Sequence, residues 1–179
     1  MGRGNVLLGY ACKLAWGCVG ADGGWSFDIF GNGKLYLRKL RISRNDSKDD
    51  VSNEKVIDVS QEVVRELRAY FARNAASIKN LPSETYNGSL DGGFDIFTFG
   101  GKITESLNIC RHPPEHFLRV NKLTNAAIED NIKFLQAENE ILDLFQGAYE
   151  ILKKYHLGLN MTEDYFSCWW KSEEFDSRT

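Results

Sequence analysis

Two segments of the chain carry the same tetrapeptide ahead of a glycine turn and a lysine. Residues 27–30 read FDIF and run into the turn at 31–34, and residues 94–97 read FDIF again ahead of the turn at 100–102. Apolar and polar side chains alternate on both sides of each turn, as in a β-hairpin with one buried face. Two such hairpins constrain the chain to build an antiparallel sheet. We expect hairpins around residues 25–43 and 94–109.

The glycines at 31 and 33 delimit a three-residue loop, which sets the register of the first hairpin. In the second copy the interval from FDIF to the turn is two residues longer. This difference favours two independent hairpins over a diverged repeat. Asp28 or Asp91 could meet Asp95 across a sheet as a carboxylate pair, but ordinary turn and strand positions are favoured for them. The first register pairs Phe27 with Leu37, Ile29 with Leu35, Asp28 with Tyr36, and Ser26 with Arg38.

Residues 6–19 alternate in size. Large side chains occupy the even positions from Leu8 to Cys18, and small or charged ones occupy the odd positions. This period of two is typical of a strand packed on one face. A helical stripe also fits the segment, but two glycines inside it favour the strand.

Two helical regions are expected, near residues 59–78 and 121–157. Asp58 is the expected N-cap of the first, with Gln61 as its capping-box partner. A helix over all of 121–157 would be longer than a compact domain, so we expect a break near 121–124 or 136–139. Glu138 interrupts the apolar seam, which favours core packing over a coiled coil with a second copy.

Length and composition indicate one domain over residues 1–179. The chain is 42% hydrophobic, enough for a sizeable core, and its three prolines mark no linker. Residues 44–57 are polar and are expected to form a loop. The expected fold is α+β, with an antiparallel sheet of about five strands covered by the two helical regions.

Charge is unevenly distributed along a chain whose net charge is −3. Residues 1–45 carry seven basic and two acidic side chains, a net of +5. Residues 46–62 carry six acids against two lysines, a net of −4, and residues 161–179 carry five acids against two bases, a net of −3. A basic hairpin therefore precedes an acidic segment, and the C-terminal tail is acidic.

The four cysteines form no C-x-x-C pair and resemble no disulfide framework, so we expect buried thiols in a reducing cytosol. No run approaches the roughly 20 apolar residues of a membrane span. Lys13 interrupts the short apolar stretch near the start, and no signal-peptidase site follows it. The expectation is a cytoplasmic protein without a membrane partner.

The sharpest chemical motif is HPPEH at residues 112–116, which matches the inverted zinc-protease string H-x-x-E-H. That chemistry needs both histidines on one helical face, and a residue that precedes proline is disfavoured in a helix. A turn from strand into helix is therefore favoured over a metal site. No other catalytic template is present, so we expect a protein that is not an enzyme and needs no cofactor or metal. A small metal-dependent hydrolase using His112, Glu115 and His116 is the alternative.

The basic stretch 34–44 interleaves Tyr36 with arginines and lysines. Nucleic-acid-binding sheets share this pattern, but they usually add an overall positive charge and several exposed aromatics. The pattern is better explained as a solvated strand face whose charges prevent edge pairing. Nucleic acid is disfavoured as a partner.

The stretches GWSFDIFGNGK at 24–34 and NGSLDGGF at 87–94 resemble those of small bacterial proteins. The chain as a whole, an acidic α+β domain without a catalytic signature, resembles the immunity proteins of contact-dependent or polymorphic toxin systems. The resemblance implies a cytoplasmic protein that binds a cognate toxin and occludes its active site. A homo-oligomer built through the long helix is a further alternative. The expected partner-binding residues are Asp46, Asp49, Asp50, Glu54, Tyr36, Arg38, Trp169 and Trp170.

Overall fold

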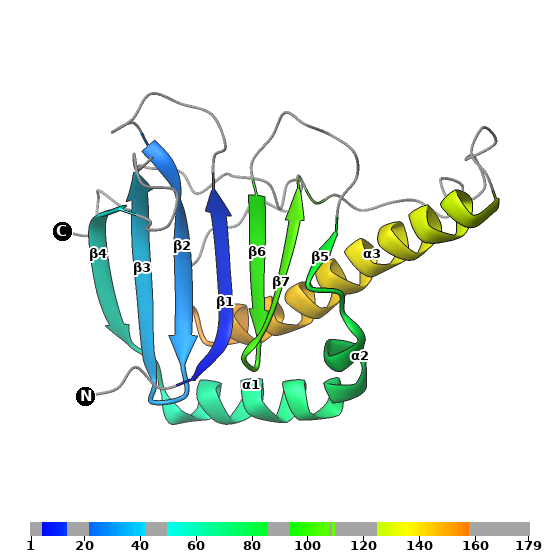
Figure 1. Ribbon diagram of the computed structural model, residues 1–179. Helices are drawn as coiled ribbons and strands as arrows, with labels where there is room; N and C mark the ends of the chain where they lie inside the picture. The colour runs from blue at the N-terminus through cyan, green and yellow to red at the C-terminus, as the bar shows by residue number, and fades with distance from the viewer. Residues whose placement is uncertain are drawn as a thin grey trace.

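The computed structural model describes residues 5–13, 22–41, 50–85, 94–107, 109 and 125–157. They form an α+β fold with one mostly antiparallel sheet and three helices (Figure 1). The strands are β1 (Val6–Lys13), β2 (Asp22–Phe30), β3 (Lys34–Arg41), β4 (Asp50–Asp58), β5 (Glu84–Thr85), β6 (Phe94–Phe99) and β7 (Lys102–Leu107). The helices are α1 (Gln61–Arg73), α2 (Ala75–Asn80) and α3 (Asn125–Lys154).

The sheet has seven strands in the order β4-β3-β2-β1-β6-β7-β5, so the expected number of five was too low. All neighbours are antiparallel except β5 and β7. The main addition is β4, which occupies residues expected to form a loop. It pairs with β3 along its length, apart from one irregularity near Leu40. An edge strand with exposed side chains needs few apolar residues, so the polar sequence of β4 did not indicate a strand.

The two FDIF segments lie on either side of β1. Equivalent positions of the two segments face opposite sides of the sheet. Tyr10 lies opposite Phe27 on one side and opposite Phe97 on the other. The register predicted for the first hairpin is confirmed, and both predicted hairpins are present. In the second copy Asp95 and Phe97 share the face of Tyr10, whereas in the first copy Phe27 and Ile29 share it and Asp28 lies on the opposite face. The two aspartates therefore lie on opposite faces of the sheet and do not pair.

The helices of the described part all cover one face of the sheet (Figure 1). The apolar stripe of α1 is buried there at Val63, Leu67 and Phe71. The core also takes the large side chains at the even positions of β1, which confirms the strand predicted for that part of the chain. The face turned toward the helices is the inner face, and the opposite one is the outer face.

The start and the extent of the first helix differ from expectation. Ser60 is the N-cap, and its hydroxyl accepts a hydrogen bond from the Val63 amide. Asp58 instead ends β4 and pairs with Lys34. The helix also stops at Asn74, whose side chain donates to the Tyr70 carbonyl, and α2 follows as a separate element. A polar side chain that hydrogen-bonds nearby backbone competes with helix continuation.

Helix α3 is continuous for 30 residues, so the break expected near 136–139 is absent. At about 1.5 Å per residue it is roughly 45 Å long. Its first turns extend beyond the sheet (Figure 1), and this overhang removes the need for a break. Its second half packs into the core through Ile141, Phe145 and Leu152. The alternative break at 121–124 lies outside the described residues.

Candidate functional site: the outer face of the sheet

The outer face carries no helix in the described part of the chain. Strand alternation and the pairing register assign residues to it, because side chains opposite each other in a ladder share a face. Three strands supply its centre: β1, β2 and β3. We define the outer face by Ala11, Lys13, Ser26, Asp28, Tyr36, Arg38, Leu40, Val51, Glu54, Val56, Ile96, Thr98, Ile103 and Glu105.

Arg38 is the centre of a charged cluster on this face. Its Nη1 donates to Asp28 Oδ2 at 2.5 Å, and its Nε donates to Glu54 Oε2 at 2.7 Å. Burial disfavours the charge of Arg38, but the hydrogen bonds to Glu54 and Asp28 outweigh burial and raise its pKa. The guanidinium also lies 5.2 Å from the centre of the Tyr36 ring. The cluster joins β2, β3 and β4 into one rigid surface.

One donor of this cluster has no partner among the residues that the structure describes. Arg38 is only 9% exposed, and its buried Nη2 makes no hydrogen bond to any of them. A buried polar group without a partner costs about 1–3 kcal/mol. The Arg38 side chain therefore retains hydrogen-bonding capacity that an oxygen atom of a partner would satisfy after a small local movement.

A shallow hollow of about 180 Å³ lies beside Arg38. Glycine at position 9 helps to shape this region, because a Cβ there would lie 2.6 Å from Asp28 Oδ1 and 3.2 Å from Thr98 Cβ. The alternation of small residues along β1 thus leaves room for polar side chains of its neighbours. Besides Arg38, the hollow is lined by Tyr10, Ala11, Lys13, Ser26, Asp28, Leu40, Ile96 and Thr98.

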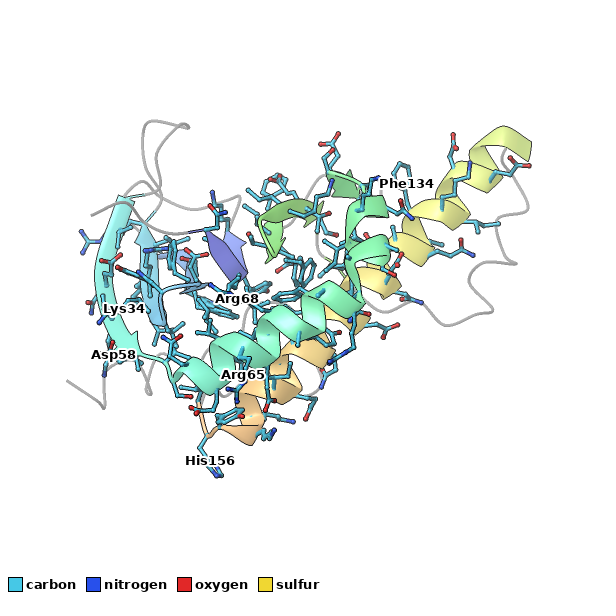
Figure 2. All side chains as sticks on the ribbon, turned by 90° about the horizontal axis from the view of Figure 1, so that it is seen from below. Lys34, Asp58, Arg65, Arg68, Phe134 and His156 are labelled. Atoms are coloured by element: carbon cyan, nitrogen blue, oxygen red, sulfur yellow. The ribbon has the colours of Figure 1, made fainter. Side chains whose placement is uncertain are left out.

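Exposed apolar side chains lie on the same face, close to its two ends. The described residues include four large apolar side chains that are exposed. Val51 and Val56 on β4 and Ile103 on β7 lie on the outer face, at 47%, 47% and 58% exposure. The fourth, Phe134, lies on α3 (Figure 2). Because three of the four share one face, that face is the stronger candidate for an interaction surface.

A second polar cluster is buried on the inner face. Asp95 accepts hydrogen bonds from the Tyr10 hydroxyl at 2.6 Å and from the Ile109 amide at 3.3 Å. Burial raises the pKa of Asp95 to about 6 against these hydrogen bonds, and the nearby Glu138 adds to the rise. Glu138, itself buried, accepts from the hydroxyl of Thr85. These groups are enclosed between sheet and helix, so we assign them to the core.

The predicted partner-binding residues divide into two groups. Tyr36, Arg38 and Glu54 come together on the outer face. The Glu54 carboxylate pairs with Arg38, and its role as a partner contact stays a prediction. Asp50 begins β4 instead of lying in a loop. Asp46, Asp49, Trp169 and Trp170 lie outside the described residues.

The metal motif of His112, Glu115 and His116 also lies outside the described residues. Within the described part, the structure contains no group of three histidine, cysteine, aspartate or glutamate side chains that could bind a metal ion. None of the described helices combines the length and apolar character required to cross a membrane.

The basic strand was correctly placed, but our explanation of its charges was wrong. β3 is an interior strand between β2 and β4, so its arginines and lysines do not protect an edge. Arg38 instead neutralises acidic side chains of both neighbouring strands. Asp28 was not predicted as the partner of Arg38, although the predicted register placed Asp28 within reach, diagonally across the strand pair.

Cys12 does not have the free thiol that we expected. It is buried on the inner face and disulfide-bonded, and its partner cysteine lies outside the described residues. Disulfides persist in oxidising compartments and are rare in the cytosol. This bond therefore counts against the reducing environment that we expected.

Comparison with known proteins gives no family for the chain. No protein-family model matches it, and no curated protein matches it at a significant level of sequence similarity.

Proposed function

We propose that the protein is a protein-binding module that binds its partner with the outer face of the sheet. The partner we propose is a cognate toxin of a contact-dependent or polymorphic toxin system, inhibited by occlusion of its active site. One observation carries the proposal: the sheet face without a described helix is also the face with most of the exposed large apolar side chains.

The composition of the outer face supports protein binding over small-molecule catalysis. Protein interfaces combine apolar contacts with a polar surround and about one hydrogen bond per 100–200 Å². Here Val56 and Ile103 supply apolar contact area, and the cluster around Arg38 supplies fixed charges. The hollow beside Arg38, of about 180 Å³, could receive a side chain of a partner protein.

The proposed mechanism is steric occlusion by a rigid surface. The ion pairs of Arg38 hold three strands in one arrangement, so little conformational freedom is lost on binding. The unused Nη2 of Arg38 offers a hydrogen bond to a partner oxygen atom. A cytoplasmic location is part of this proposal and depends on the redox state of Cys12.

The proposal is tested by co-expression with the products of neighbouring genes. A neighbour that arrests growth when expressed alone should be neutralised by this protein and should copurify with it in a fixed ratio. Ile103→Lys and Val56→Lys should abolish neutralisation, because a desolvated lysine in the interface is costly.

Phe134→Lys is the matched control, because it adds the same charge at an exposed apolar position on α3 (Figure 2). It should leave neutralisation intact. If no neighbour is toxic and none copurifies in cells shown to express them all, the immunity proposal is refuted. If Phe134→Lys abolishes neutralisation and the sheet variants do not, the outer face is the wrong surface.

A further inference from the structure

We propose that the hollow beside Arg38 binds the carboxamide of an asparagine or glutamine side chain of the partner protein. The hollow lies over β1, where the small residues Gly9 and Ala11 leave space between the side chains of β2 and β6. Its volume of about 180 Å³ equals that of roughly six water molecules in the liquid. A hollow of this size holds one side chain of a partner, and the polar atoms around it determine which kind.

Two oxygen atoms beside Gly9 are available to a ligand. Arg38 binds Oδ2 of Asp28, and the other oxygen, Oδ1, lies 2.6 Å from the position that a Cβ on Gly9 would take. Thr98 Oγ1 approaches the same position from β6, at 3.3 Å. Neither oxygen has a hydrogen-bond partner among the residues that the structure describes. The hydroxyl of Ser26, which also lines the hollow, has none in the described part of the chain either.

The charges around the hollow favour a neutral ligand group. Two basic and two acidic side chains sum to zero there, namely Lys13, Arg38, Asp28 and Glu54. A carboxylate in the hollow would place a second acceptor-only anion beside Asp28 Oδ1, and the two would repel each other. An ammonium group would share Asp28 with Arg38, and it has no acceptor for the hydroxyl hydrogens of the hollow.

A carboxamide satisfies both kinds of protein group at once, because its N–H donors and its carbonyl oxygen are separate atoms. An N–H group can donate to Asp28 Oδ1 while the carbonyl oxygen accepts from the hydroxyl of Thr98 or Ser26. These three residues lie on paired strands, so their positions are fixed before the ligand enters. The inference deepens the proposed function and rests on it only in assigning the carboxamide to a protein partner.

Three small compounds test the site without the native partner. The N-acetyl methylamides of glutamine, glutamate and lysine share the same backbone amides and differ only in the side chain. NMR titration of the full chain, followed at the backbone amides of Gly9, Ala11 and Ser26, measures their affinities. The glutamine compound should bind at least about threefold more tightly than either other compound, as one net hydrogen bond provides. Equal or weaker binding of the glutamine compound would overturn the proposal.

A single substitution should then exchange the preference. Asp28→Asn keeps an oxygen for Arg38 and turns an amide N–H toward the hollow, so the glutamate compound should bind at least as tightly as the glutamine compound. Asp58→Asn is the matched control, because Asp58 is paired with Lys34 away from the hollow (Figure 2). It should retain the preference for glutamine.

The two substitutions also separate this site from the proposed function. Loss of the glutamine preference in both variants, or in neither, would refute the carboxamide site. A glutamine preference that changes only in Asp28→Asn, in a protein that neutralises no neighbouring toxin, would instead remove the proposed function and leave the site standing.

Discussion

Asp95 shows how the environment of one residue depends on the strand beside it. Its carboxylate is 2% exposed and lies among Tyr10, Ile109 and Glu138. Burial raises the pKa of Asp95 from 3.8 to about 6, so the folded state binds this proton more tightly than the unfolded chain does. The contribution of Asp95 to the free energy of unfolding therefore falls as pH rises from about 4 to above 6.

Asp95→Asn should remove this pH dependence. Asparagine can keep both hydrogen bonds, because the Tyr10 hydroxyl can accept as well as donate. The free energy of unfolding of the variant, relative to the wild type, should rise by about 2–3 kcal/mol between pH 4 and pH 7. Urea denaturation across that range measures it, and parallel pH profiles for the two proteins would contradict the assignment.

Arg38 is the residue whose removal should most disturb the outer face. Arg38→Gln leaves Asp28 and Glu54 without their cation. We expect a loss of about 2 kcal/mol, less than for a fully buried pair because both carboxylates remain partly solvated. The double variant Arg38→Gln/Glu54→Gln should recover part of this loss in thermal and urea unfolding. If the double variant is less stable than the single one, repulsion between the carboxylates is not the cause.

At the scale of elements, helices α1 and α3 come into close contact at Gly147. A Cβ on Gly147 of α3 would lie 2.2 Å from the hydroxyl oxygen and 2.7 Å from the Cζ of Tyr70 on α1. The same hydroxyl donates to the Leu144 carbonyl at 3.1 Å. Glycine costs a helix about 1 kcal/mol relative to alanine, so close packing against Tyr70 must compensate for it.

The effect of Gly147→Ala on the free energy of unfolding should therefore have opposite signs with tyrosine and with alanine at position 70. In the wild type the clash should outweigh helix propensity and destabilise the protein by about 1–3 kcal/mol. In a Tyr70→Ala background the same substitution should stabilise it by up to about 1 kcal/mol. A double-mutant cycle by urea unfolding measures both effects. Destabilisation by the same amount in both backgrounds would contradict the contact.

Elements marked by turn chemistry could be predicted from sequence, and those defined by tertiary contacts could not. Glycines at 31 and 33 fixed the register that places Asp28 opposite Tyr36. The polar residues of β4 give no alternating signal, because their pairing depends on β3. The burial of Asp95 could not be predicted either, since the equivalent Asp28 of the first FDIF copy lies on the opposite face of the sheet. Tyr36, Arg38 and Glu54 were predicted as contacts from composition and charge, but the ion pairs of Arg38 required the structure.

At the scale of the whole molecule, the disulfide at Cys12 bears on where the protein resides. The structure has this bond, whereas a cytosolic inhibitor should carry four free thiols. Thiol labelling under denaturing conditions, followed by intact-mass measurement, counts them in protein taken directly from its native cells. We expect two fewer labelled thiols than cysteines if the bond forms in the cell. Labelling of all four would support the reducing cytosol.

The central claim is that the outer face of the sheet binds a protein partner. The most direct test is photo-crosslinking in the native cell, with benzoylphenylalanine placed at Val56 or, as a control, at Phe134. Both side chains are exposed, and they belong to different surfaces of the molecule. We predict one crosslinked protein of defined mass from position 56 and none from position 134. A crosslink from position 134 alone, or from neither position in cells that express a copurifying partner, would contradict the claim.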